Sequence, residues 1–272
     1  PKPFIFNIII NFMNNRQIVD VLSERWTKSG LEKGDIFLLH SNIRRLLLEF
    51  KEKKIKLDVK IIINSFLDTI GENGTLLMPL FNFECIKKNF FSLKKTKSQM
   101  GILTESFRMN YQILRTKHPV YSFAVFGKNI EKFEVDNFSA YGENSPFDIL
   151  RKMNGKIAIL DLEDQNSMTF YHHIEEMNNV DWRYHKTFTG MYEDFEGNLY
   201  EKEYSIYVRN LKKKIITQVN PAGKLLWSNG LYKGSLPNTG YGLRVLNTID
   251  VYEFISKIIL DGKAKGVLYN QT

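Results

Sequence analysis

The segment Gly34-Asp35-Ile36-Phe37-Leu38-Leu39-His40 decides the fold class of this chain of 272 residues. A turn signal at Gly34-Asp35 leads into an apolar run without polar alternation. Such a run is typical of a strand that is covered on both faces. Residues 15–30 before it and residues 59–70 after it carry apolar side chains at helical spacing. The sequence around Gly34 therefore predicts a buried strand flanked along the chain by helices.

Helical and strand patterns alternate along much of the chain. We expect strands at residues 75–78, 121–126 and 156–160, and helices at residues 98–111, from Ser145-Pro146 onward, at 167–177 and at 249–259. Serine caps a helix and proline fits its first turn, which places a helix start at Ser145. Strands that alternate with helices predict a layered α/β fold.

Residues 183–208 have a different pattern, with strand-like alternation around the turn Asp194-Phe195-Glu196-Gly197-Asn198. This pattern predicts a hairpin, and we take the hairpin to make the sheet mixed rather than purely parallel. The segment Gly240-Tyr241-Gly242-Leu243-Arg244 is interpreted as a turn. No linker or repeat divides the chain. We therefore expect one domain over residues 13–272, with residues 1–12 as an N-terminal extension.

The composition limits the class of protein. The apolar run from Phe4 to Phe12 is interrupted by asparagine and is too short to cross a bilayer, so we expect no membrane insertion. The lone cysteine, Cys85, excludes an intrachain disulfide and fits a reducing compartment. These observations predict a cytoplasmic protein.

The formal net charge of +8 has two interpretations. Lysines cluster at residues 51–56, 87–97 and 212–214, and basic patches are one requirement for nucleic-acid binding. No nucleic-acid motif accompanies them, so solvated lysine surfaces explain the charge more simply and we expect no nucleic-acid partner. A basic site would also suit a small ligand that carries phosphate.

Polar residues follow the predicted buried strand at His40-Ser41-Asn42. Ligand sites of α/β folds lie in the loops after strand carboxyl ends. Backbone N–H groups and a hydroxyl at this position can hold a thioester oxygen or a phosphate. The alternative is that Ser41 or Asn42 only caps the next helix.

Three further groups can carry chemistry. His118, held extended by Pro119, and Ser122 can face a common cleft, although a buried structural histidine is the alternative. Cys85 would be a nucleophile if a histidine reached it, but free cysteine is usually a small buried hydrophobe. His172 and Glu175 stand at i and i+3 of a predicted helix, and a carboxylate that orients a histidine can make a general base.

The pair at His172 also has competing interpretations. An incidental pair on a solvated helix gives the same spacing. A metal site would need more ligands, and neither a second helical histidine at i+4 nor a cysteine cluster is present, so we expect no metal.

Seven segments, in this order, resemble the aminoglycoside 3-N-acetyltransferase family. They are Gly34-Asp35 through His40-Ser41-Asn42-Ile43-Arg44, Gly74-Thr75-Leu76-Leu77-Met78-Pro79, residues 101–107, His118-Pro119 to Gly127, Tyr141-Gly142-Glu143-Asn144-Ser145-Pro146, Asn154-Gly155-Lys156-Ile157 and Thr169-Phe170-Tyr171-His172-His173-Ile174-Glu175. The resemblance implies a three-layer α/β/α sandwich with a central mixed sheet. It also implies acetyl-CoA as the acetyl donor and a primary amine as the acceptor.

The resemblance assigns roles to particular residues. The family's helical histidine matches His172 rather than His173, because only His172 keeps the spacing to Thr169 and Glu175. A further acidic residue downstream is matched to Glu203. The donor side is assigned to His40, Ser41, Asn42, His118, Ser122 and Thr169. Transfer is expected to be direct, so Cys85 should be dispensable.

The acceptor is inferred from charge. The block Trp182-Arg183-Tyr184-His185-Lys186 is basic and aromatic, which disfavours a polycationic drug and favours an acceptor with phosphate. We therefore expect an amino-sugar N-acetyltransferase for surface-glycan synthesis that acts on a nucleotide-linked sugar and contacts it through Phe81, Arg183, Tyr184 and Lys186. A homodimer is compatible with this interpretation. The alternatives are an aminoglycoside-resistance enzyme and a non-catalytic basic binding protein of the same fold.

Overall fold

A seven-stranded mixed sheet forms the centre of the computed structural model, which describes residues 13–272. The expected N-terminal extension, residues 1–12, lies outside the described residues. The strand order is β10-β11-β6-β1-β2-β5-β4. The bounds are β1 Ile36–Ser41, β2 Thr75–Pro79, β4 Leu114–Arg115, β5 Phe123–Gly127, β6 Lys156–Leu160, β10 Lys233–Gly234 and β11 Leu243–Asn247. Strand β1 runs parallel to both β2 and β6, and the outer strands are antiparallel to their neighbours.

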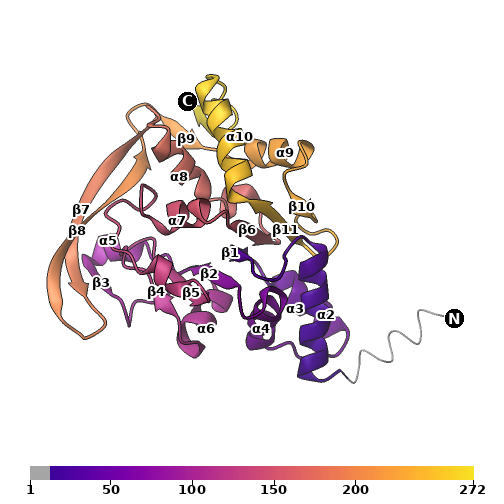
Figure 1. The fold of residues 1–272 in the computed structure, drawn as a ribbon. Coiled ribbons are helices and arrows are strands. Elements are labelled where there is room, and N and C mark those ends of the chain that lie inside the picture. The colour runs from indigo at the N-terminus through magenta and orange to yellow at the C-terminus, as the bar shows by residue number, and fades with distance from the viewer. Residues whose placement is uncertain (1–12) are drawn as a thin grey trace.

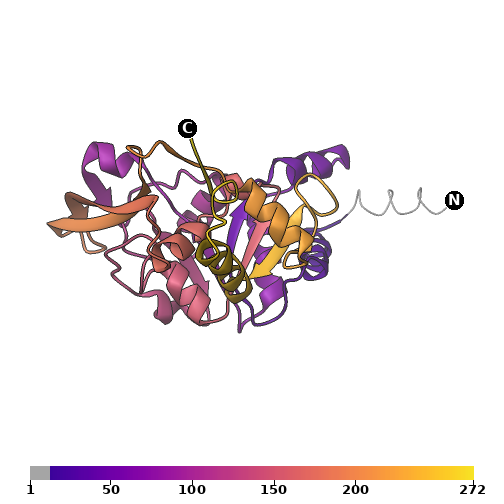
Figure 2. The same ribbon diagram turned by 90° about the horizontal axis from the view of Figure 1, so that it is seen from above.

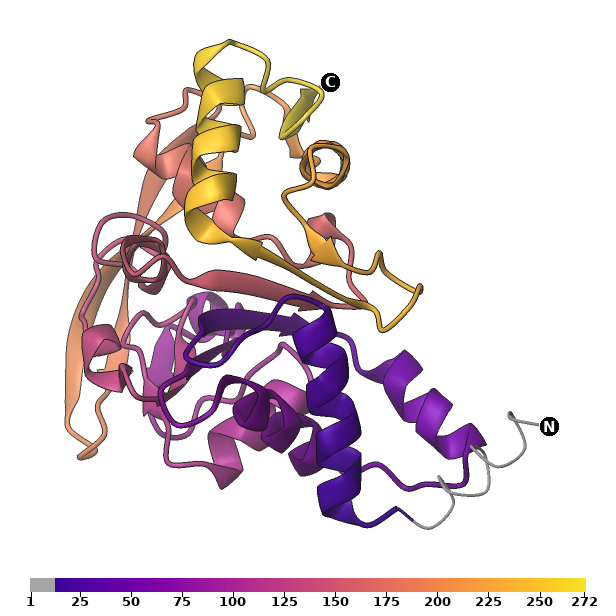
Figure 3. The ribbon, with the colours of Figure 1, turned by 45° about the vertical axis from the view of Figure 1, so that its right-hand side comes forward.

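Helices cover both faces of this sheet (Figures 1 and 3). One face carries α2 Asn15–Lys28, α3 Arg44–Glu52, α4 Val59–Ile70 and α6 Ile102–Asn110. The other carries α7 Pro146–Lys152, α8 Phe170–Met177 and α10 Thr248–Leu260. Phe37 and Leu39 of β1 are buried against the first layer and Leu38 against the second. The predicted three-layer sandwich and the doubly covered central strand are both confirmed.

The hairpin is present, but it does not belong to the central sheet. Strands β7 Arg183–Glu193 and β8 Leu199–Arg209 pair along their whole length, and β7 also pairs with β3 Phe90–Ser92 in a separate sheet. Figure 2 shows this sheet at the opposite end of the molecule from α2. The central sheet is mixed because of β4, β5, β10 and β11. The expectation that the hairpin made it mixed was wrong.

The segment interpreted as a turn at residues 240–244 in fact leads into β11, which pairs antiparallel with β6. Arg244 lies in this strand and is buried in the core, where it donates to Asp164 Oδ1 at 2.9 Å and to the Leu162 carbonyl at 2.6 Å. Asp164 also accepts from the hydroxyls of Tyr171 and Tyr232, at 2.7 and 2.9 Å. A charged residue in a short strand hides the apolar pattern, which explains the missed strand.

The remaining elements are short. They are α5 Glu84–Lys88, α9 Asn220–Ser228, β9 Ile215–Thr217, β12 Tyr269–Gln271 and the 3-10 turns η1 Ile130–Phe133 and η2 Asp164–Asn166. No helix within residues 13–272 is long and apolar enough to span a membrane.

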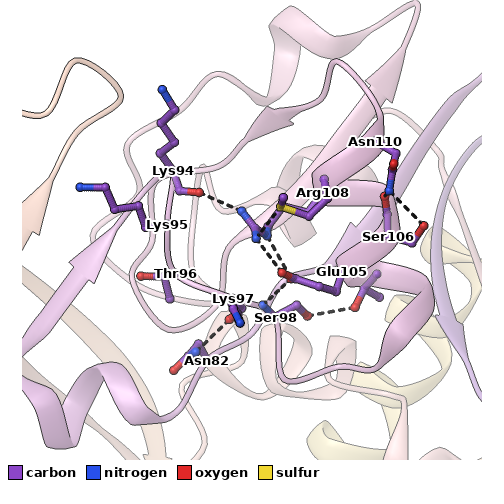
Figure 4. A network of polar contacts seen from close by, with 12 residues as sticks. Asn82, Lys94, Lys95, Thr96, Lys97, Ser98, Glu105, Ser106, Arg108 and Asn110 are labelled. Carbon is purple, nitrogen blue, oxygen red and sulfur yellow. Dashed lines mark hydrogen bonds and ion pairs between the residues drawn. The ribbon is translucent and has the colours of Figure 1, made fainter.

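A polar network fixes the loop before α6 (Figure 4). Glu105 accepts from the Ser98 backbone N–H at 2.9 Å and from Arg108 Nη2 at 2.6 Å, while Arg108 Nη1 donates to the Lys94 carbonyl at 2.8 Å. The Ser98 and Thr104 hydroxyls are 2.9 Å apart. Ser98 is hydrogen-bonded to the side chains of Glu105 and Thr104 and lies in the loop before α6. The expected helix at residues 98–111 therefore begins only at Ile102.

Candidate active site

The side chains of His172 and Glu175 meet on one face of α8. The His172 Nδ1–H donates to Glu175 Oε2 at 2.8 Å, and the His172 side chain is 20% exposed whereas that of Glu175 is 1% exposed. The spacing of three residues places both side chains one turn apart, as the sequence indicated. The imidazole can therefore present its other nitrogen, Nε2, away from the carboxylate.

Glu175 is held by two residues that follow α8. Trp182 Nε1 donates to Oε1 at 2.8 Å, and Arg183 Nε lies 2.5 Å from Oε2. Burial by itself raises the pKa of Glu175, but the Arg183 charge and the His172 contact outweigh it and hold that pKa below its ordinary value. Glu175 is thus a buried carboxylate at neutral pH.

His172 is a neutral imidazole at neutral pH. Burial lowers its pKa, the nearby Arg183 charge lowers it further, and Glu175 only partly opposes these effects. A neutral ring with its Nδ1 proton on a carboxylate can accept a proton at Nε2. This is the requirement for a general base.

His173, the second histidine of the doublet, has a different environment. It is wholly buried. Its Nδ1–H donates to the Tyr141 carbonyl at 2.5 Å, and its Nε2 accepts from Arg151 Nε at 3.2 Å. Both ring nitrogens are engaged in packing α8 against α7, so the geometry supports the choice of His172 for chemistry.

A cleft of about 400 Å³ opens beside His172. Three cationic side chains contribute to its lining, Arg183, Lys186 and Arg209, and no Asp or Glu does so among the described residues. Aromatic rings form much of the remaining wall: Tyr121, Tyr141, Tyr184, Phe188 and Tyr207. The cleft therefore suits a ligand with negative charge and with flat or apolar surfaces.

A second cavity, of about 730 Å³, lies at the carboxyl ends of β1 and β2. His40, Ser41 and Asn42 line it together with Arg44 and Lys51. The His40 ring is buried, which lowers its pKa to about 4, and its Nε2 has no hydrogen-bond partner among the described residues.

This cavity has further walls from residues 99–104, which lie at the end of the loop before α6 and in its first turn, and from Leu162 and Asn166. Asn42 also has a structural contact, since its Oδ1 accepts the Arg44 N–H at 3.1 Å at the start of α3. The N-cap residue of α3 is Ile43, which makes no side-chain capping hydrogen bond, so Asn42 holds the first turn from one position earlier while still lining the cavity.

His118 and Ser122, predicted for the donor site, line neither of these two cavities. His118 is wholly buried; its Nδ1 accepts from the Tyr121 N–H at 3.1 Å and its Nε2 faces the Ser205 carbonyl at 3.2 Å. The Ser122 hydroxyl accepts from Arg115 Nε at 3.1 Å. The contacts of both residues are internal to the protein.

Three other predicted residues also lie outside the two cavities. Glu203 is exposed on β8 opposite Thr189, and Glu175 rather than Glu203 contacts the His172 ring. Phe81 is buried, with its ring 4.8 Å from that of Tyr121. The Thr169 carbonyl accepts the His172 N–H at 2.9 Å at the start of α8.

Cys85 has no histidine partner among its hydrogen bonds in the described part of the chain. Its Sγ lies 3.6 Å from Asn82 Oδ1, and burial raises the pKa of the thiol to about 11. A thiol that stays protonated at neutral pH is a poor nucleophile.

Several residues of the site were not predicted from the sequence. Tyr121, Tyr141, Tyr207 and Arg209 come from separate segments and no local pattern connects them to His172. Trp182 follows Glu175 by seven residues, and only the fold shows that its indole N–H reaches the carboxylate.

A buried carboxylate orients a neutral histidine beside a ligand-sized cleft, and a second cavity lies at the edge of the sheet. This arrangement is suited to an enzyme that transfers a group between two substrates. The chain belongs to the aminoglycoside 3-N-acetyltransferase family, whose sequence model matches residues 38–241. It is thus a member of a family of acetyltransferases.

Solved structures have the same fold. AAC-IIIb, described as binary with CoASH, is 19% identical, with a TM-score of 0.74 over 90% of this chain and 96% of that one. Sisomicin-bound AAC-VIa is 16% identical, with a TM-score of 0.70 and coverage of 90% and 98%. The YokD protein of Bacillus subtilis is 19% identical, with a TM-score of 0.71 and coverage of 89% and 99%.

Proposed function

We propose that the protein transfers the acetyl group of acetyl-CoA to the primary amine of an amino sugar that carries phosphate, with a nucleotide-linked sugar as the preferred form. The observation that carries this proposal is the charge of the cleft beside His172. Lys186 and Arg209 supply positive charge to its lining, whereas the charge of Arg183, which also lines it, is compensated by Glu175; no carboxylate lines the cleft among the described residues. Such a lining repels a polycationic aminoglycoside and attracts a phosphate.

The second cavity supports acetyl-CoA as the donor. Apolar side chains such as Leu47 and Met100 offer a surface for a pantetheine arm, and Arg44 and Lys51 offer charge for phosphates. The AAC-IIIb structure, described as binary with CoASH, is consistent with this assignment.

The proposed reaction is a direct transfer. His172 Nε2 accepts a proton from the acceptor amine, whose nitrogen lone pair attacks the thioester carbonyl carbon. The tetrahedral intermediate collapses as the C–S bond breaks, and the proton held at His172 Nε2 passes to the CoA sulfur, so CoA leaves as the thiol and His172 is neutral again. General-base assistance of this kind contributes about 10²- to 10⁴-fold to the rate. Glu175 holds the ring in position and no acyl-enzyme forms.

The alternative is an aminoglycoside-resistance enzyme with the same mechanism. The sisomicin-bound structure of AAC-VIa favours this alternative for that relative. The lining of the cleft in this chain opposes it, because a drug with several ammonium groups would meet the cations Lys186 and Arg209 and, among the described residues, no acid in the lining. A non-catalytic binding protein is a further alternative, and it would not need a paired His172.

The test is CoA release from acetyl-CoA with free amino sugars, nucleotide-linked amino sugars and kanamycin-type drugs. We expect turnover of a nucleotide-linked sugar. Lys186→Met should raise the KM for that acceptor by about tenfold through loss of one charge-assisted contact. Lys224→Met, on exposed α9, is the matched control and should leave KM unchanged. Turnover of the drugs alone would refute the argument from charge, and turnover of no acceptor by wild type and His172→Ala alike would favour the binding protein.

A further inference from the structure

Arg183, predicted to contact the acceptor, directs its guanidinium inward. Its side chain is 5% exposed. Nη1 donates to the Tyr207 carbonyl and Nη2 donates to the Thr217 hydroxyl, both at 3.1 Å. The two Nη contacts therefore anchor the group to β8 and β9, and the remaining nitrogen, Nε, lies against Glu175.

The contact between Arg183 and Glu175 acts through charge. Arg183 Nε is 2.5 Å from Glu175 Oε2, but the N–H is not aligned for a hydrogen bond. The same Oε2 accepts the Nδ1 proton of His172 at 2.8 Å. One carboxylate oxygen therefore lies between a permanent cation and the ring that is to act as base.

A carboxyl as deeply buried as Glu175 takes up a proton unless a cation compensates its charge. Arginine is suited to this task because it does not lose its own proton in proteins. Trp182 contributes a neutral hydrogen bond to Oε1 but no charge. Arg183 is the cation that the structure pairs with Glu175 within residues 13–272.

The other titratable groups that face His172 do not replace this compensation. The Tyr141 ring lies 5.3 Å from the His172 ring, and burial raises the pKa of Tyr141 and of Tyr121, so both remain neutral. The β-hairpin contributes to the same cleft only cations and neutral side chains: Tyr184, Lys186, Tyr207 and Arg209. Glu175 is the acidic group in contact with the ring.

We propose that Arg183 is a positioning residue that keeps the buried His172–Glu175 pair in the state with one proton, on His172 Nδ1, so that Nε2 is free to accept the proton of the acceptor amine. Without the cation, the buried pair gains a second proton near neutral pH and Nε2 is blocked. This inference rests on the proposed general-base mechanism but not on the identity of the acceptor.

The test compares the pH dependence of kcat/KM in wild type, Arg183→Met and Arg183→Lys, with whichever acceptor turns over. Arg183→Met should lower kcat at pH 7 by about 10- to 100-fold, with activity returning as the pH is raised, because the acid limb moves upward. Arg183→Lys should keep the acid limb of the pH profile of kcat/KM near its wild-type position, because Arg183 acts on the His172–Glu175 pair through its charge rather than through an aligned hydrogen bond. Arg209→Met, the matched arginine of the cleft, should change the acceptor KM without moving the limb.

A second measurement needs neither an acceptor nor an Arg183 variant. Nitrogen-15 NMR of the wild type at pH 7, with the His172 signals assigned by their loss in His172→Gln, should show a protonated Nδ1 and an unprotonated Nε2. An imidazolium or an Nε2–H tautomer at pH 7 would overturn the proposal. So would a uniform loss of activity in Arg183→Met at every pH with an unmoved limb. Failure of all amino sugars to react, with the expected NMR result, would instead refute only the proposed acceptor.

Discussion

Glu176, the residue after Glu175, should make the protein less stable as the pH rises. Its side chain is 8% exposed; Oε2 accepts from the Ser139 hydroxyl at 2.8 Å, and Oε1 lies 3.7 Å from His185 Nε2. Burial raises the pKa of Glu176 to about 7, from an ordinary value of 4.5. The folded protein therefore holds a proton in this interval that the unfolded chain has released.

The sign and size of this pH effect on the free energy of unfolding follow from proton linkage. Because the folded pKa lies above the unfolded one, the stabilisation is fully present below pH 4.5 and is lost as the pH rises through about 7. At 1.36 kcal/mol for each pKa unit, the loss is about 3 kcal/mol. Glu176→Gln keeps the shape and cannot ionise, so its advantage over wild type should grow by about 2 to 3 kcal/mol between pH 5 and pH 8.

The assay is urea unfolding of both proteins at pH 5 and pH 8. Burial lowers the pKa of His185, which is present in both proteins. Glu203→Gln, an exposed glutamate on β8, is the control and should show no pH-dependent difference from wild type. Equal pH dependence of wild type and Glu176→Gln would show that water reaches the Glu176 carboxylate and would refute the reasoning.

Three further predictions concern the site and its support. His172→Ala should lower kcat by at least about 100-fold while acetyl-CoA still binds, as measured by single-turnover kinetics and calorimetry; wild-type turnover in this variant would exclude His172 as the base. Cys85→Ala should keep kcat, because the thiol has a pKa of about 11 and no histidine partner; loss of activity in a folded variant would indicate an acyl-enzyme. Arg244→Met should cost about 3 kcal/mol in urea unfolding, since it leaves the buried Asp164 carboxylate without its cation; an unchanged midpoint would mean that the tyrosine hydroxyls suffice.

Features set by neighbours along the chain could be predicted from the sequence. The doubly covered strand β1 follows from its own apolar run, and α7 begins where Ser145 caps it and Pro146 follows. The contact between His172 and Glu175 follows from one helical turn. In each case the residues concerned are close in sequence, so their geometry depends little on the rest of the fold.

Features set by distant segments could not be predicted. The hairpin pairs with β3 rather than with the central sheet, and no pattern within residues 183–208 specifies that partner. Arg183 was assigned to the acceptor because it stands in a basic block, yet its guanidinium is drawn inward by Glu175, Tyr207 and Thr217. The burial of His118 likewise depends on β8, whose Ser205 carbonyl faces its ring.

The position of β11 in the sheet has a consequence for synthesis of the chain. Strand β6 pairs with β1 on one side and with β11 on the other, and Arg244 of β11 lies 80 residues beyond its partner Asp164. A ribosome therefore synthesises α8 long before β11, the strand that pairs with β6. During that interval the apolar strand β6 has an open edge, which is the moment at which a nascent chain is most exposed to pairing with another copy of itself.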